Sequence, residues 1–146
     1  MDSDLLRLGA ILVGLITAMV TIWRVLVWRR TQQVLARNQA FSAYLAAAQQ
    51  YPRQAAPGLF EIERGSEEWV RYTYFVASML HVFECVLQYT RNEPAWNEAL
   101  RAHLRYHWRY LRTPEFKHTL SGYDRRLVAL INDVIRETEG RATQQS

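Results

Sequence analysis

Residues 8–23 read LGAILVGLITAMVTIW, an apolar stretch that contains no charged residue. Arg7 precedes the stretch, Arg24 follows it, and the apolar residues just outside these arginines extend it to residues 5–28. About 24 residues form a helix of roughly 36 Å, which is long enough to cross a hydrocarbon core of about 30 Å. The stretch therefore predicts one transmembrane helix over residues 5–28.

The residues at the two ends of this stretch suit a membrane interface and predict an orientation. Long arginine side chains near a helix end reach the lipid headgroups, and tryptophan rings are enriched at the same level. More arginines follow the stretch than precede it, Arg37 among them, so the positive-inside rule predicts an extracytoplasmic N-terminus, residues 1–4, and a cytoplasmic remainder. The expected membrane-interface anchors are Arg7, Trp23, Arg24, Trp28, Arg29 and Arg30.

A cleaved signal peptide and a buried helix of a soluble protein are the alternatives to a retained anchor. The chain starts with acidic residues, has no Ala-x-Ala cleavage site near the end of the stretch, and continues directly into arginines, all of which disfavour a signal peptide. No polar stripe interrupts residues 8–23, which disfavours a soluble amphipathic helix. A retained anchor is the favoured interpretation.

Small residues recur at four-residue spacing within the stretch, a pattern that lets transmembrane helices approach closely. The predicted packing face consists of Ala10, Gly14, Thr17, Ala18 and Thr21. We expect it to contact another membrane protein subunit or a second copy of the chain. A heptad-like seam further along would extend that contact into the cytoplasm; it consists of Val34, Phe41, Tyr44 or Leu45, and Ala48.

Composition limits the compartment and the partners. The net charge of the 146 residues is only +4, so a nucleic-acid role gains no support. Arginine accounts for all basic residues except Lys117, which is typical of GC-rich bacterial genomes. Cys85 is the single cysteine and permits no internal disulfide, in agreement with a reducing cytoplasm. We expect a location in a bacterial inner membrane.

Beyond the anchor, apolar residues recur every three or four positions, so the fold class is predicted to be all-α, with a small helical bundle of about four helices. The anchor helix is expected to continue as a juxtamembrane extension over residues 29–51. The cytoplasmic helical domain is expected over residues 52–139, and a flexible tail over residues 140–146.

Capping residues and prolines predict where the later helices begin. Ser66 caps a helix that extends to about residue 91, after a partly packed loop over residues 52–65. A second helix follows over residues 95–112, a short one begins after Thr113 and ends near residue 120, and the last covers residues 123–138. The apolar bands predicted to form the core are Trp69, Tyr72, Val76, Met79, Leu80, Phe83, Val86 and Leu87, then Trp96, Leu100, Leu104 and Leu111, then Tyr123, Leu127, Leu130, Ile131, Val134 and Ile135.

Two histidine-bearing helix faces are candidates for metal or haem ligation. His81 and Glu84 share one face of their helix, and His103 and His107 are one turn apart on the next. Bundle-core metal sites use such residues, but with more carboxylates and with Glu-x-x-His spacing. The alternative is that the histidines border the core with a ring nitrogen bonded to a neighbour, and no cofactor is predicted.

The helix expected over residues 95–112 carries a one-sided arginine row that could bind an anionic partner, which consists of Arg101, Arg105, Arg109 and Arg112. Acidic headgroups or an acidic protein partner would suit it. A solvated face with Glu98 and more distant acids as partners is the simpler interpretation, and nucleic acid is the least favoured because the net charge is small.

No catalytic arrangement is evident. The chain has no Gly-x-Ser-x-Gly motif, no phosphate-binding glycine loop and no carboxylate pair placed for acid–base chemistry. Cys85 lies among apolar residues of a helix, where a thiol is normally inert packing. An enzyme is not expected, and no small-molecule substrate is identified.

The pattern resembles small bacterial proteins that have one N-terminal transmembrane helix and a short cytoplasmic helical domain. The residues that carry the resemblance are Trp69, Trp96, Asn97, Glu98, Trp108, Thr113, Pro114, Glu115 and Phe116. The resemblance implies this architecture and no activity.

The sequence therefore favours a single-pass, membrane-anchored helical module that acts as a non-catalytic accessory subunit of a larger membrane assembly. Its expected partners are membrane lipids and either other membrane subunits or a second copy of itself. The first alternative is a membrane-tethered metal- or haem-binding sensor that uses His81, Glu84, His103 and His107. The second is a membrane effector that oligomerises.

Overall fold

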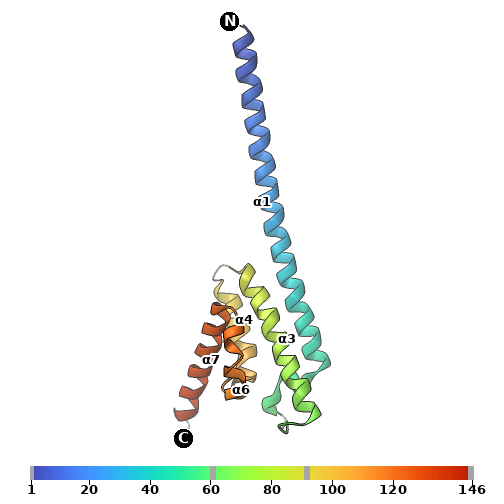
Figure 1. Cartoon of the computed structure of the whole chain (residues 1–146), viewed down its shortest axis with the longest axis vertical. Helices are drawn as coiled ribbons and strands as arrows, with labels where there is room; N and C mark the ends of the chain where they lie inside the picture. The colour runs from blue at the N-terminus through green and yellow to red at the C-terminus, as the bar shows by residue number, and fades with distance from the viewer. Residues whose placement is uncertain (1, 60–61, 91–92, 145–146) are drawn as a thin grey trace. The chain divides into compact units, whose positions relative to one another are not determined.

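The computed structural model describes residues 2–59, 62–90 and 93–144, and every regular element in these ranges is helical. The predicted all-α class is thereby confirmed. In chain order (Figure 1) the elements are α1 (Asp2–Gln50), α2 (Pro52–Ala55), the 3₁₀ turn η1 (Pro57–Leu59), α3 (Glu67–Tyr89), α4 (Pro94–Tyr106), α5 (Trp108–Leu111), α6 (Pro114–Lys117), the 3₁₀ turn η2 (Leu120–Gly122) and α7 (Arg125–Gln144).

The chain forms two compact units, Met1–Ala36 and Arg37–Ser146. We refer to the second unit as the helical domain. The division falls inside α1, so the helical domain begins earlier than the predicted start at residue 52. The reason is that the last part of α1 supplies core side chains, as described below.

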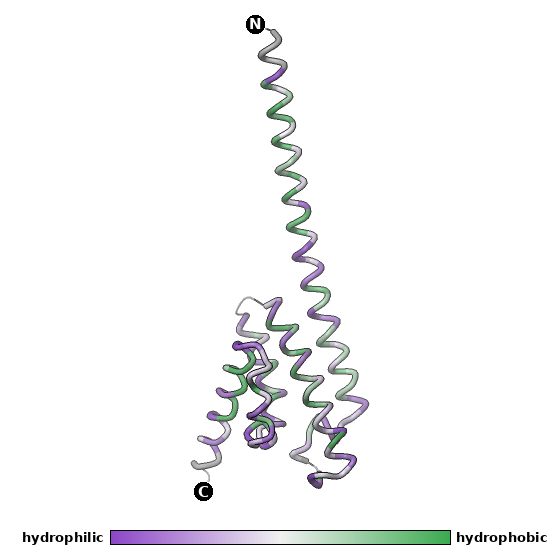
Figure 2. Tube along the Cα trace, viewed as in Figure 1, coloured by the Kyte–Doolittle hydropathy of each residue, from purple (hydrophilic) through white to green (hydrophobic). Residues whose placement is uncertain are grey.

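The first unit contains the apolar part of α1, whose helical conformation continues past Trp28 as the sequence predicts. Figure 2 shows the run of hydrophobic residues along it. Within the described residues, α1 is the one helix long and apolar enough to cross a membrane, and none of its most apolar window is buried.

The last part of α1 belongs to the core of the helical domain. Tyr44 is buried, and Phe41 and Ala48 are partly buried against the core cluster. The ring of Phe41 lies 5.1 Å from the ring of Trp96 in an edge-on arrangement, measured between centroids. Most of the predicted seam is therefore used inside the domain, whereas Val34 is exposed.

Helix α3 is the central core helix, and its start follows the predicted cap. The Oγ of Ser66 accepts a hydrogen bond from the amide of Trp69 at 3.0 Å, and Gly65 takes a positive φ of 84° just before it. Every predicted core residue of α3 is buried except Trp69, which is partly buried. At the other end, the guanidinium of Arg126 donates to the carbonyls of Leu87 and Thr90 and so caps the helix.

Helix α7 packs against both α3 and α4 (Figure 1). Its buried residues are Leu127, Leu130, Ile131 and Val134, and Ile135 is partly buried. Tyr123, which precedes the helix, is also partly buried against the core, and α4 and α5 contribute Leu100, Leu104 and Leu111. The predicted apolar bands are thus confirmed as the core.

The structure differs from the predicted elements mainly at four places. The helix expected over residues 95–112 is interrupted at His107, whose φ of −106° and ψ of 4° end α4 and begin α5. The sequence has no glycine or proline there; the ring of His107 is buried against α3, and this tertiary contact accompanies the break. The loop over residues 52–65 contains α2 and η1, and the helix that Thr113 caps ends at Lys117.

The fourth difference is the C-terminal end. Residues 140–144 continue α7, where the sequence predicted a flexible tail. A glycine inside a helix costs only about 1 kcal/mol relative to alanine, so Gly140 does not by itself end α7. Residues 145 and 146 of the predicted tail lie outside the described residues.

Candidate functional site

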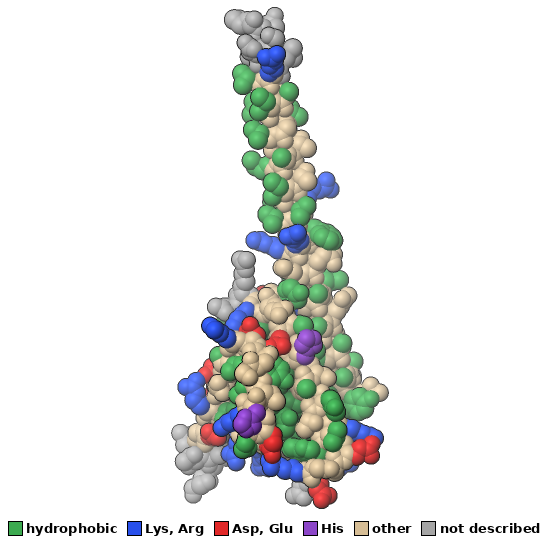
Figure 3. All heavy atoms as spheres, viewed as in Figure 1, with side chains coloured by type: hydrophobic (Ala, Val, Ile, Leu, Met, Phe, Trp, Pro, Cys, Tyr) green, Lys and Arg blue, Asp and Glu red, His purple; other side chains and the backbone are tan. Residues whose placement is uncertain are grey.

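The apolar part of α1 presents its side chains to the surroundings. The large hydrophobic residues between Leu8 and Trp28 are 44% to 71% exposed. In Figure 3 hydrophobic side chains line much of the upper part of this helix. A soluble protein rarely exposes an apolar patch larger than a few hundred Å². An exposed apolar surface of this kind is typical of a helix that contacts lipid or another protein.

The predicted small-residue face lies within this surface. A Cβ added at Gly14 would meet nothing within 4 Å, so the face is open. The hydroxyl of Thr17 donates to the carbonyl of Val13 at 2.9 Å, and that of Thr21 donates to the carbonyl of Thr17 at 2.8 Å. Both hydroxyl protons are thus satisfied inside the helix, which is a requirement for polar groups in lipid.

The four candidate metal ligands do not form one site. The side chain of His81 is 77% exposed, and its Nδ1 lies 3.9 Å from the carboxylate of Glu84. Glu84 also accepts a hydrogen bond from the amide of Asp124. Over residues 2–59, 62–90 and 93–144, no group of three or more His, Cys, Asp or Glu side chains is placed to hold a metal.

His103 and His107 instead form polar links inside the core. The Nδ1 of His103 is hydrogen-bonded to the hydroxyl of Tyr44 at 3.1 Å, and the Nδ1 of His107 to that of Tyr72 at 3.2 Å. These pairs join α4 and its C-terminal cap residue to α1 and α3. This arrangement corresponds to the interpretation in which the histidines border the core with a ring nitrogen bonded to a neighbour, rather than to metal or haem ligation.

Burial keeps both imidazoles neutral. Burial, followed by the nearby His103, lowers the pKa of His107 to about 4, and burial also lowers the pKa of His103. The same effect raises the pKa of the Tyr44 and Tyr72 hydroxyls, which stay protonated. Each pair is therefore an uncharged hydrogen bond at neutral pH.

Because the pKa of His107 differs between the folded and the unfolded chain, we expect the helical domain to lose stability in acid. In the folded chain its pKa is about 4, whereas the ordinary value is 6.5. Between these values the unfolded chain binds a proton that the folded chain does not, so the free energy of unfolding falls as the pH falls from about 6.5 to about 4, by roughly 3 kcal/mol. Chemical denaturation of the full chain in detergent at several pH values measures this slope.

His107→Gln removes the titration while leaving a side chain that can bond to Tyr72. We expect its free energy of unfolding to depend less on pH over that window than that of the unmodified chain. His81→Gln, the same exchange at an exposed position, controls for the chemistry of the substitution. Identical slopes for His107→Gln and the unmodified chain would contradict the assignment.

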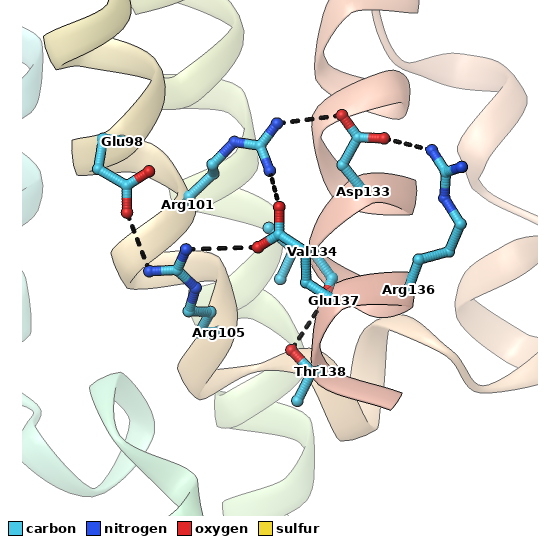
Figure 4. Close-up of polar contacts among 8 residues, drawn as sticks. All are labelled: Glu98, Arg101, Arg105, Asp133, Val134, Arg136, Glu137 and Thr138. Carbon is cyan, nitrogen blue, oxygen red and sulfur yellow. Dashed lines mark hydrogen bonds and ion pairs between the residues drawn. The ribbon is translucent and has the colours of Figure 1, made fainter. Parts of the chain in front are cut away.

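Two members of the predicted arginine row are engaged within the helical domain (Figure 4). The guanidinium of Arg101 contacts Asp133 at 3.0 Å and also Glu137, both on α7. The guanidinium of Arg105 bonds to Glu98 at 3.0 Å and to Glu137 at 3.4 Å. These ion pairs hold α4 to α7, so neither arginine is free for an anionic partner.

The other two members are more exposed. Arg112 lies 3.8 Å from Glu139 and stacks over Trp108, and the guanidinium of Arg109 lies 5.8 Å from the centre of the same ring. Arg37, counted above among the cytoplasmic arginines, is only 8% exposed. It pairs with Glu93 at 3.1 Å and stacks on Trp96.

An open groove of about 1180 Å³ lies on the helical domain beside the break between α4 and α5. We call it the aromatic groove because its walls contain the aromatic residues Trp69, Tyr72, Tyr106, Trp108 and Tyr110. Arg64, Arg105 and Arg109 also line it, together with a single acid, Glu63. The sequence did not reveal this groove because its walls come from separate segments, although Tyr106 and Tyr110 stood out beside the arginine row.

Two buried nitrogens of groove-lining residues have no hydrogen-bond partner. They are the Nε of Arg105 and the Nε2 of His107, the two such side-chain atoms found in the described part of the chain. Buried polar atoms are nearly always bonded, so an exception needs a physical explanation.

Comparison with protein-family models, with curated proteins and with solved structures found no match for this chain.

Proposed function

We propose that this protein is a single-pass membrane protein whose α1 spans the bilayer over residues 5–28, with the helical domain as a non-catalytic interaction module in a larger membrane assembly. The observation that carries the proposal is the uncharged apolar surface between Leu8 and Trp23, all of whose large hydrophobic side chains are exposed. Burial of apolar area in lipid contributes about 25 cal/mol for each Å², so such a surface is stable only when covered.

The flanking residues support an orientation with residues 1–4 outside and the helical domain in the cytoplasm. Arg24, Arg29 and Arg30 follow the apolar stretch, and Trp23 and Trp28 are placed at the same end. Arg37 is paired with Glu93 inside the helical domain, so it is not counted among the arginines that face the lipid headgroups. The remaining arginines still outnumber Arg7.

Alkaline extraction of membranes tests the anchor. A spanning chain stays in the membrane pellet and floats with lipid in a density gradient, whereas a peripherally bound chain is released. Intact-mass measurement of the same sample checks that residues 8–23 are still present. Release at alkaline pH, or a mass that lacks these residues, would overturn the proposal.

The small-residue face predicts a second property, assembly in the membrane. Gly14→Ile fills the open face with a branched side chain, so close approach of a second helix is blocked. We expect a smaller assembly in native-like lipid, measured by size and by cross-linking. Gly9→Ile, at a position equally open but off the face, is the matched control. An unchanged size after Gly14→Ile would remove this face from the interface.

A further inference from the structure

We propose that the aromatic groove is the docking site for an acidic segment of a partner protein, one whose carboxylates lie next to an aromatic or aliphatic side chain. The inference rests on the proposed function, because it names the surface through which the interaction module acts. It concerns the helical domain alone and is independent of how the chain is held in the membrane.

The composition of the groove favours a protein partner. Tryptophan, tyrosine and arginine are the residues that dominate binding energy at protein interfaces, and here they supply most of the walls. Three of these rings contact one another: Trp69 lies 5.6 Å from Tyr110, edge to face, and Tyr72 lies 5.6 Å from Trp69 and 5.4 Å from Tyr110, measured between centroids. Such a surface accepts an aromatic or aliphatic side chain.

The size and shape of the groove favour a segment of chain over a small molecule. Its volume of about 1180 Å³ exceeds that of most small-molecule pockets, which have about 300–1,000 Å³, and it is open to solvent. An extended peptide can lie along an open groove, whereas a small molecule needs enclosure to bury most of its surface.

The charges favour an acidic segment. Three arginines line the groove against one acid. Arg105 is paired with Glu98 and Glu137, so the cations available at the rim are Arg64 and Arg109. The side chain of Arg64 is 63% exposed and pairs at 3.9 Å with Glu115, which is 67% exposed, so a competing carboxylate can replace this surface ion pair.

Two nitrogens of groove-lining residues, the Nε of Arg105 and the Nε2 of His107, are buried without a hydrogen-bond partner. The rest of the Arg105 guanidinium is held by carboxylates of the domain. Because both nitrogens are buried, a docked segment contacts the exposed rings and arginines of the groove and not these atoms.

A peptide selection tests the proposal. The full chain, held in nanodiscs of phosphatidylcholine, is presented with a display library of random peptides. We expect enrichment of sequences in which Asp or Glu adjoins Trp, Phe or Leu. Their affinity should fall about tenfold or more in the double variant Arg64→Glu with Arg109→Glu, and should weaken as salt is raised.

Two further variants separate a binding effect from misfolding. Tyr106→Ala removes a ring that is 56% exposed at the groove, so it should weaken binding without unfolding the domain. Arg125→Glu reverses an exposed charge outside the groove and should leave binding unchanged.

Three results would overturn the proposal: no enriched peptide, enriched peptides without acids, or acidic peptides whose binding survives the groove substitutions. If nothing is enriched while the double variant loses binding to phosphatidylglycerol vesicles, the groove is a lipid site instead. Failure here leaves alkaline extraction unaffected, so the groove and the anchor are tested separately.

Discussion

Arginine in place of both Leu15 and Ile16 is expected to abolish stable membrane integration of the chain. These residues lie midway along the apolar stretch and are 60% and 59% exposed. A single arginine at the centre of a bilayer costs about 2.5–3.5 kcal/mol on the insertion scale, and two cost roughly twice as much. The fraction that resists alkaline extraction and floats with lipid measures the effect.

The matched control is the pair Val34→Arg and Leu35→Arg. These residues are also apolar neighbours on α1, 44% and 50% exposed, but they follow the predicted span. We expect the control variant to remain integrated. If the Leu15 and Ile16 variant integrates as well as the control, the apolar stretch is not what holds the chain in the membrane.

Phe83→Ala is expected to cause the largest loss of stability in the helical domain. The side chain of Phe83 is fully buried, and its ring lies 5.4 Å from that of Tyr44 and 6.3 Å from that of His103. Phe→Ala at such sites lowers the free energy of unfolding by about 3–5 kcal/mol, through lost apolar burial and the cavity left behind. Small domains have only about 5–15 kcal/mol in total, so partial unfolding is expected.

Chemical denaturation of the full chain in detergent, followed by near-ultraviolet circular dichroism, measures this loss. Tyr74→Ala on the same helix is the control, because Tyr74 is 71% exposed and a surface change away from special contacts alters stability by about 0.5 kcal/mol at most. Equal stability of the two variants would contradict the described core.

The helices and the core could be predicted from the sequence because they depend on local chemistry. The hydroxyl oxygen of Ser66 accepts a hydrogen bond from the amide of Trp69, and that of Thr113 accepts one from the amide of Phe116, as capping residues do at any helix start. The apolar band from Tyr72 to Leu87 follows directly from helical spacing. Both features can be recognised without knowing the contacts between distant segments of the chain.

Contacts between distant segments could not be predicted in the same way. The arginine row has helical spacing whether it faces solvent or α7, and only the fold brings Asp133 and Glu137 against Arg101. Likewise, the spacing of His103 and His107 suits both a metal and a core, and the decision comes from Tyr44 and Tyr72 on other helices.

The break at His107 and the aromatic groove are two related features that could not be predicted from the sequence. His107 has ordinary helix propensity and no neighbouring proline or glycine, so nothing local indicates that α4 ends there. The groove then combines residues from before α3, from α3 itself and from the region around that break. Its existence depends on tertiary packing, which a periodic pattern does not encode.

Photolabelling from within the bilayer shows whether residues 8–23 of α1 lie in lipid. A carbene reagent that partitions into the bilayer is activated in membranes that contain the full chain, and the labelled positions are located by peptide mass spectrometry. We expect dense labelling over residues 8–23 and little over α3, α4 and α7. Labelling that is absent from residues 8–23, or no stronger there than in the helical domain, would contradict this placement in lipid.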